Sequence, residues 1–178
     1  MENNPRRTVY AEKIFKLAKD RVNEVFYNSS PEHAIIVHQA LVQNADSYVY
    51  IFSSSMCTEV SNNPEYCEIV KRFLSGSEKR KIKIVLTHYE KENFPEKPIA
   101  KVLALFPSQV EVRKFDGQVE YKGKPAHFTV SDDRAFRLET NIEDQMAFGN
   151  FNSPDQATDL KKVFENVYNS SLTTPVAY

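Results

Sequence analysis

The stretch HFTVSDDRAFRLE, residues 127–139, carries the most information about the fold of this chain. Residues 128–131 and 134–138 are rich in β-branched and aromatic side chains, which is typical of strands. The two aspartates between them, Asp132 and Asp133, form a short polar turn. The stretch therefore predicts two consecutive strands. A third strand is expected at residues 146–149, with no helical pattern before it.

The part of the chain before this stretch has a different pattern, in which helices and strands alternate. Short apolar runs at residues 48–52, 82–86 and 110–115 each follow a helical segment, so crossover units with parallel strands are expected. Three of the helices open with a Ser-Pro or Asn-Pro pair, which suits a cap and the first turn. Helices are expected over residues 8–27, 30–44, 63–76, 97–106 and 153–168.

These elements predict an α/β fold with a mixed, largely parallel sheet and helices on both faces. Asp116-Gly117 is expected to start a hairpin, because both residues tolerate a positive φ. The last helix offers the Ser153-x-x-Gln156 spacing of a capping box. With 178 residues the chain suits one globular unit, here residues 30–178, preceded by an amphipathic helix within residues 1–29.

Composition narrows the classes of function. Lys and Arg number 23 against 24 Asp and Glu, so no global field favours nucleic acid or an acidic membrane, and any anion site has to be local. No apolar run approaches a membrane span and no leader pattern is seen, which predicts a cytoplasmic protein. Cys57 and Cys67 lack metal-binding spacing and are expected to be reduced, and neither a metal nor a cofactor is expected.

The order of elements and two motifs resemble the phospholipase D superfamily in its single-motif form. The motifs are Asp132-Asp133-Arg134 and the later Gly149-Asn150-Phe151-Asn152, and the similarity extends over roughly residues 30–170. Family members carry His-x-Lys, four residues, Asp, a Gly/Ser-rich stretch and an asparagine. The resemblance implies that histidine attacks phosphorus, lysine and asparagine neutralise the phosphoryl oxygens, and aspartate orients histidine. Since two motifs meet in one site, it also implies a homodimer.

The sequence fits the family pattern in two registers, and the motif is degenerate in both. In the first, His127 is the nucleophile, Thr129 stands at the lysine position and Arg134 at the aspartate position. Histidine then lacks its orienting acid. Losing a single charged donor commonly costs about 100- to 1000-fold in rate, so little hydrolytic activity is expected.

The second register is preferred, because residues 132–136 match the usual turn after the motif strand. Asp132 is then the family aspartate, Pro125 takes the nucleophile position and His127 the lysine position. In either register Leu138-Glu139-Thr140 replaces the Gly/Ser segment, and a free glutamate would repel phosphate.

The candidate site residues come from these strands and from one loop. Alternation along the strands can direct several polar side chains to one cleft, whereas Arg137 and Glu139, two apart on one strand, can instead form ion pairs within the sheet. The hydroxyl-rich loop of residues 53–63 leaves the carboxyl end of the first strand, where open α/β sheets place ligands. The candidate catalytic residues are His127, Asp132 and Glu139; the candidate ligand-binding residues are Arg137, Asn150, Asn152, Ser53 and Ser54.

Other polar residues are assigned structural roles. His33 and His38 lie within the second helix and are expected to be structural, while His88 follows a strand end and is a weaker site candidate. The run of residues 78–83, EKRKIK, is expected to be a solvated strand entry, with phosphate contact as the alternative.

Two functions follow. The first is a non-catalytic module, most simply a homodimer, that binds a partner protein or a phosphate-bearing ligand; such degenerate domains resemble components of bacterial defence systems. The second is a metal-independent phosphodiesterase or nuclease that uses His127 across a dimer interface.

Overall fold

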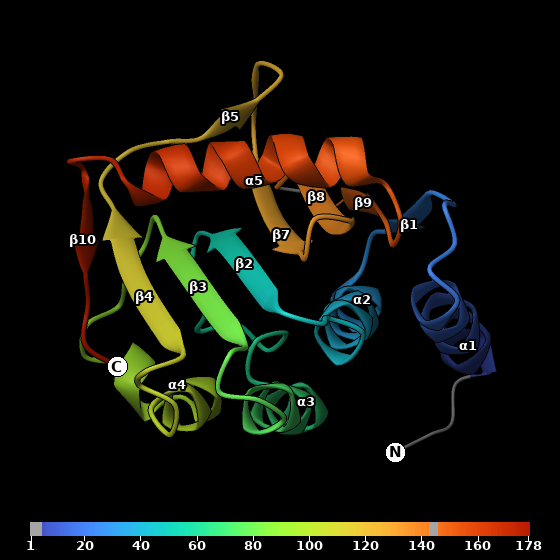
Figure 1. Cartoon of the computed structure of the whole chain (residues 1–178), viewed down its shortest axis with the longest axis horizontal. Coiled ribbons are helices and arrows are strands. Elements are labelled where there is room, and N and C mark those ends of the chain that lie inside the picture. The colour runs from blue at the N-terminus through green and yellow to red at the C-terminus, as the bar shows by residue number, and fades with distance from the viewer. Residues whose placement is uncertain (1–4, 143–145) are drawn as a thin grey trace.

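A mixed eight-stranded sheet forms the centre of the molecule in the computed structural model, which describes residues 5–142 and 146–178 (Figure 1). A separate two-stranded hairpin, β5 and β6, projects from it. The strands are β1 (Phe26–Asn28), β2 (Tyr48–Ser53), β3 (Lys81–Leu86), β4 (Val110–Phe115), β5 (Glu120–Tyr121), β6 (Lys124–Pro125), β7 (His127–Ser131), β8 (Ala135–Asn141), β9 (Met146–Asn150) and β10 (Thr173–Pro175).

Three helices begin close to the predicted positions, because each of the three predicted Ser-Pro or Asn-Pro pairs lies at a helix N-terminus. Ser30 and Asn63 accept hydrogen bonds from the backbone N–H groups of His33 and Tyr66 and so cap two helices. No helix among the described residues has the length and apolar character needed to cross a membrane. The helices are α1 (Pro5–Lys19), α2 (Pro31–Gln43), α3 (Pro64–Ser75), α4 (Pro98–Leu103) and α5 (Pro154–Tyr168), with a short 3₁₀ helix, η1, at Phe94–Glu96.

The sheet order is β1-β9-β8-β7-β2-β3-β4-β10. Pairing is parallel between β2 and β3 and between β3 and β4, as predicted, and antiparallel at the other neighbours. The mixed sheet with helices on both faces is confirmed, but the parallel part is smaller than expected. Parallel pairing requires a crossover, and the chain supplies helical crossovers only between β2, β3 and β4.

Side chains alternate between two cores along the central strands. Phe52, Val85 and Phe128 pack with α5 on one face of the sheet. Val49 and Ile84 point to the opposite face and pack with α3 and α4. Helix α2 covers the adjoining part of that second face, where it also contacts α1. The period of two in the strands therefore separates one sheet into two buried layers.

The opening stretch forms the predicted strand-turn-strand. β7 and β8 pair antiparallel, with His127 opposite Glu139 and Thr129 opposite Arg137. Asp132 has a φ of 53° in the turn, a left-handed conformation that Asp tolerates better than most residues. These pairings place the four polar side chains on one face of the sheet, the face covered by α2.

The N-terminal segment differs from the prediction of one helix over residues 8–27. Helix α1 ends at Lys19, and Arg21, with a φ of 51°, reverses the chain. Residues 26–28 then form the edge strand β1 against β9, with Phe26 buried. Pairing with the sheet edge outweighs the helical period, so residues 5–28 form a strand as well as a helix.

Two local predictions near the other elements are wrong. The hairpin turns at Lys122-Gly123, where both residues have positive φ, and Asp116-Gly117 only bends the chain before it. The capping box at α5 does not form, because the Ser153 hydroxyl donates to Gln156 Oε1 at 3.1 Å instead of capping the backbone. After α5 the chain adds β10 beside β4, which the sequence analysis did not predict.

Candidate functional site

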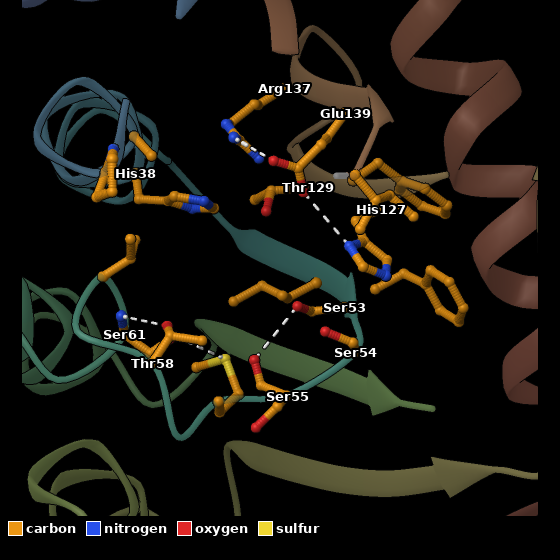
Figure 2. Close-up of a pocket in the computed structure, with 18 of the residues that line it drawn as sticks. His38, Ser53, Ser54, Ser55, Thr58, Ser61, His127, Thr129, Arg137 and Glu139 are labelled. Carbon is orange, nitrogen blue, oxygen red and sulfur yellow. Dashed lines mark hydrogen bonds and ion pairs between the residues drawn. The ribbon is translucent and has the colours of Figure 1, made fainter. Parts of the chain in front are cut away.

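A pocket of about 260 Å³ lies at the carboxyl end of β2. Its walls come from α2, the loop that follows β2, and strands β7 and β8, and Figure 2 shows the polar side chains turned toward it. The predicted candidates His127, Arg137, Glu139, Ser53 and Ser54 all line this pocket. The fold thus brings five of the eight candidates together.

Glu139 is the centre of a hydrogen-bonded network in the pocket wall. Its Oε1 accepts from the Arg137 guanidinium at 3.1 Å, and its Oε2 lies 3.3 Å from His127 Nδ1. Arg137 Nε also donates to Asn28 Oδ1 at 3.1 Å. The side chains are 6% (Arg137), 13% (Glu139) and 14% (His127) exposed, so the network is shielded from solvent.

The electrostatics keep Glu139 ionised. Burial by itself would raise the pKa of Glu139, but the hydrogen bond from His127 and the charge and hydrogen bond of Arg137 outweigh it, so the pKa lies below its usual value. The expected ion pair between Arg137 and Glu139 is thus present. Because Arg137 compensates the carboxylate, Glu139 does not act as the free negative charge that the sequence analysis expected to repel phosphate.

His38 is a pocket residue that the sequence analysis assigned only a structural role. It projects from α2 toward the space that Arg137 and Thr129 also face (Figure 2). Burial, with a smaller effect from Arg137, lowers the pKa of His38 to about 3, so this imidazole is neutral at neutral pH. The sequence feature that could have identified His38 is the helical spacing of Pro31, Ala34 and His38, which puts all three on one side of α2.

The loop after β2 forms the pocket wall opposite β8. Ser53 donates its hydroxyl to the Ser55 carbonyl at 3.3 Å, and the hydroxyls of Thr58 and Ser61 lie 3.1 Å apart. Ser55 is tied to Glu90 by a 2.8 Å hydrogen bond. These bonds hold a hydroxyl-rich loop at the carboxyl end of a parallel strand, where the sequence analysis placed it.

Asp132 lies at the other end of β7 and does not approach His127. Its carboxylate accepts from the backbone N–H groups of Asp46 and Ser47 at 2.9 Å and of Tyr48 at 3.2 Å. Four residues of β7 lie between Asp132 and His127, which puts the two residues roughly 16 Å apart at strand spacing. Asp132 therefore holds the backbone at residues 46–48 and does not orient His127. The carboxylate that contacts His127 is that of Glu139.

Asn150 and Asn152 also lie away from the pocket. Asn150 pairs with Phe136 near the far end of β8, and its Nδ2 donates to Asn23 Oδ1 at 2.7 Å. Its Oδ1 accepts from the backbone N–H of Asn152 at 2.8 Å. Asn150 therefore does not converge with His127 and Glu139, because β9 runs antiparallel to β8 and places Asn150 opposite Phe136.

The described part of the chain contains neither a cluster of potential metal ligands nor a disulfide bond. Within residues 5–142 and 146–178, no three His, Cys, Asp or Glu side chains are arranged to hold a metal ion. Cys57 and Cys67 are free thiols, the second one buried, as predicted.

Solved structures of low sequence identity share the fold of this protein. Nuc from Salmonella typhimurium, a phospholipase D family member, superposes with a TM-score of 0.54 at 10% identity and covers 88% of this chain and 99% of its own. NucT from Helicobacter pylori gives 0.55 at 12% identity, with 88% and 99% covered. TrmBL2, an archaeal chromatin protein with a novel mode of DNA binding, gives 0.60 at 11% identity, with 97% of this chain and 62% of its own. At these identities the likeness establishes a phospholipase D-like fold.

The family is more specific than the fold. Residues 30–176 match the model of the family described as "Domain of unknown function (DUF7931)", and the chain belongs to that family. No curated protein sequence matches this chain.

Proposed function

We propose that the protein is a non-catalytic binding module whose pocket takes a small phosphate-bearing ligand. The observation that carries the proposal is the occupation of both Glu139 carboxylate oxygens, one by Arg137 and one by His127. The Arg137 guanidinium already donates hydrogen bonds to Glu139 and to Asn28. A buried cation whose charge is already compensated contributes little to a transition state that gains negative charge.

The lysine of the family motif has no substitute that clamps phosphate from β7. In the first register its position is Thr129, a buried side chain opposite Arg137. In the second register it is His127, whose Nδ1 faces Glu139. Neither arrangement supplies the free cation that phosphodiester hydrolysis uses.

Ground-state binding makes smaller demands than hydrolysis. The pocket offers hydroxyl groups from Ser54 and Thr129 and imidazoles from His38 and His127, while the Ser53 hydroxyl already donates to the Ser55 carbonyl. These groups can donate hydrogen bonds to phosphate oxygens. The Arg137–Glu139 pair adds no net charge, so the carboxylate does not exclude an anion.

Binding can be tested with inorganic phosphate as the probe. Phosphate at about 100 times its dissociation constant is expected to raise the free energy of unfolding by about 2.7 kcal/mol, measured by urea denaturation. His127→Ala is expected to weaken binding about tenfold, because one imidazole donor is lost. His88→Ala is the matched control, since His88 is exposed and outside the pocket. Equal stabilisation of wild type and His127→Ala would contradict the assignment of the pocket.

Turnover decides between this function and the alternative, a metal-independent phosphodiesterase that uses His127. One observation favours the alternative: Glu139 holds Nδ1 of His127, which leaves Nε2 for attack in the way an orienting acid does. The assay uses bis(p-nitrophenyl) phosphate without metal. We expect no hydrolysis above background. Hydrolysis that disappears in both His127→Ala and Glu139→Ala would establish the alternative and overturn the non-catalytic reading.

We also propose that the module is a homodimer, as the resemblance implies. The sheet edge at β1 supports this, because Tyr27 is 73% exposed there and Met146 on the neighbouring β9 is 53% exposed. Light scattering is expected to give twice the chain mass of 20.5 kDa. Tyr27→Lys should shift the mass toward the monomer, because a charge at a strand edge opposes pairing. A monomeric wild type would refute the dimer. Binding of a partner protein and a role in bacterial defence remain expectations from the resemblance.

A further inference from the structure

A second surface lies on the opposite face of the sheet from the pocket. In Figure 1, α5 crosses the carboxyl ends of β2, β3 and β4 and leaves their amino ends uncovered on that face. A groove of about 390 Å³ lies there. Lysines from the run at residues 78–83 meet tyrosines of β2 in it, because Lys81 pairs with Tyr48 and Lys83 with Tyr50. The groove is lined by Ser47, Tyr48, Tyr50, Lys79, Lys81, Lys83, Ser108, Gln109 and Glu111.

This surface carries an excess of positive charge although the chain as a whole does not. Within the described part of the chain, Lys79, Lys81 and Lys83 form no ion pair, and Lys81 Nζ only donates to the Ser108 carbonyl at 2.6 Å. The acidic group at the rim, Glu111, is already bound by Arg113 and by the Tyr168 hydroxyl. Lys83 lies opposite Glu111 in the register of β3 and β4 and interacts with its charge, whereas Lys79 and Lys81 have no acidic partner among the described residues, so the surface keeps a net positive charge.

Aromatic rings lie between these charges. The rings of Tyr48 and Tyr50 are 4.4 Å apart, and both are half-buried. Lys83 Nζ lies 5.8 Å from the Tyr50 ring centre and 4.3 Å from that of Tyr168. On the other side, Lys161 lies 4.9 Å from the Tyr48 ring and forms an ion pair with Asp133. Aromatic rings and lysine ammonium groups therefore alternate across this surface.

We propose that this surface binds single-stranded nucleic acid. Lys81 and Lys83, about 6.6 Å apart along the strand, contact successive phosphates, and Lys79 extends the same row. Tyr48 offers a half-buried ring for base stacking, and Tyr50, which stacks on Phe164 at 4.7 Å, supports that ring from beside it. A duplex cannot use such a ring because its bases are already stacked. The site is independent of the phosphate pocket, since alternation along β2 directs Tyr50 to one face of the sheet and Ile51, a pocket residue, to the other.

The probe is a fluorescein-labelled 20-nucleotide oligothymidylate, followed by fluorescence anisotropy at low salt. Wild type is expected to bind with a log–log salt slope near −2, because about three phosphates are neutralised. Lys81→Glu/Lys83→Glu is expected to weaken binding at least tenfold. The matched control is Lys71→Glu/Lys91→Glu, which makes the same change of charge at exposed positions outside the groove. The control is expected to bind within about twofold of wild type.

Two further variants make the test specific. Tyr48→Leu keeps an apolar contact but removes the ring, and is expected to weaken binding about fivefold or more, since stacking contributes about 1–3 kcal/mol per base. His127→Ala is expected to bind the oligonucleotide like wild type, so this inference and the proposed pocket fail separately. The inference is overturned if wild type does not bind at low salt, or if both charge-reversal variants lose affinity equally while remaining folded by circular dichroism.

Discussion

Replacing Arg137 by methionine is expected to lower the free energy of unfolding by about 3–5 kcal/mol, because the substitution leaves Glu139 buried without its cation. The Arg137 side chain is only 6% exposed and donates to both Glu139 and Asn28. Asn28 Nδ2 is buried without a hydrogen-bond partner in the described part of the chain. Loss of the Arg137 Nε–H also removes the donor to Asn28 Oδ1, so the buried side-chain amide of Asn28 loses this hydrogen bond as well and the free energy of unfolding falls further.

A second substitution separates the charge from the packing. Arg137→Met/Glu139→Gln removes both charges, and it is expected to recover most of the lost stability, because no unpaired ion remains. The double-mutant cycle should give a coupling energy of roughly 1–3 kcal/mol. The comparison variant is Lys101→Met, whose ion pair with Glu96 is exposed, so its loss should cost less than about 1 kcal/mol.

The effect of Arg137→Met should also depend on pH. In the wild type the pKa of Glu139 lies below its usual value, so this carboxylate stabilises the fold above its unfolded pKa, and that stability is lost as the pH falls through the folded pKa. Without Arg137, burial favours the protonated acid and the pKa rises. The stability difference measured by urea denaturation should therefore narrow between pH 7 and pH 4. A difference that stays constant would show that the ionised Glu139 is not the cause.

The central strands of the sheet could be predicted from the sequence, whereas its two edge strands could not. Residues 127–139 alternate so regularly that both strands and their turn follow from local pattern alone. Edge strand β1 and strand β10 are three residues long, and each exists because a neighbouring strand offers free hydrogen-bonding groups. A pattern of local propensities contains no information on such distant partners, and this is why residues 20–27 resembled the end of a helix.

Some residues of the candidate site could likewise be predicted from local pattern, and others could not. Arg137 and Glu139 follow from the period of two, and the loop at Ser53 follows from the rule for the carboxyl ends of parallel strands. His38 was missed because its importance depends on which side of α2 meets the sheet. Asp132 and Asn150 were predicted in the site from the order of the motifs, but both lie at the opposite end of β7, β8 and β9 from His127 and Glu139.

The position of Asp132 leads to a second large effect, this time on the backbone. Asp132→Ala is expected to lower the free energy of unfolding by roughly 3–4 kcal/mol, because the carboxylate accepts three backbone N–H groups where α2 leads into β2. Alanine also tolerates a φ of 53° less well than aspartate does. Arg134, which is 12% exposed and lies 3.4 Å from the carboxylate, would lose part of its charge compensation.

Asp132→Asn distinguishes these causes. Asparagine adopts the left-handed conformation readily and keeps one oxygen, so it should retain the bonds from Ser47 and Tyr48 and lose the one from Asp46, at a cost of about 1–2 kcal/mol. Asp133→Ala is the neighbouring control, since that side chain is 65% exposed and its ion pair with Lys161 should contribute less than about 1 kcal/mol. Phosphate affinity measured on the folded fraction should be unchanged in Asp132→Asn, because Asp132 lies at the other end of β7 from the pocket. A loss of affinity at unchanged stability would instead return Asp132 to the functional site.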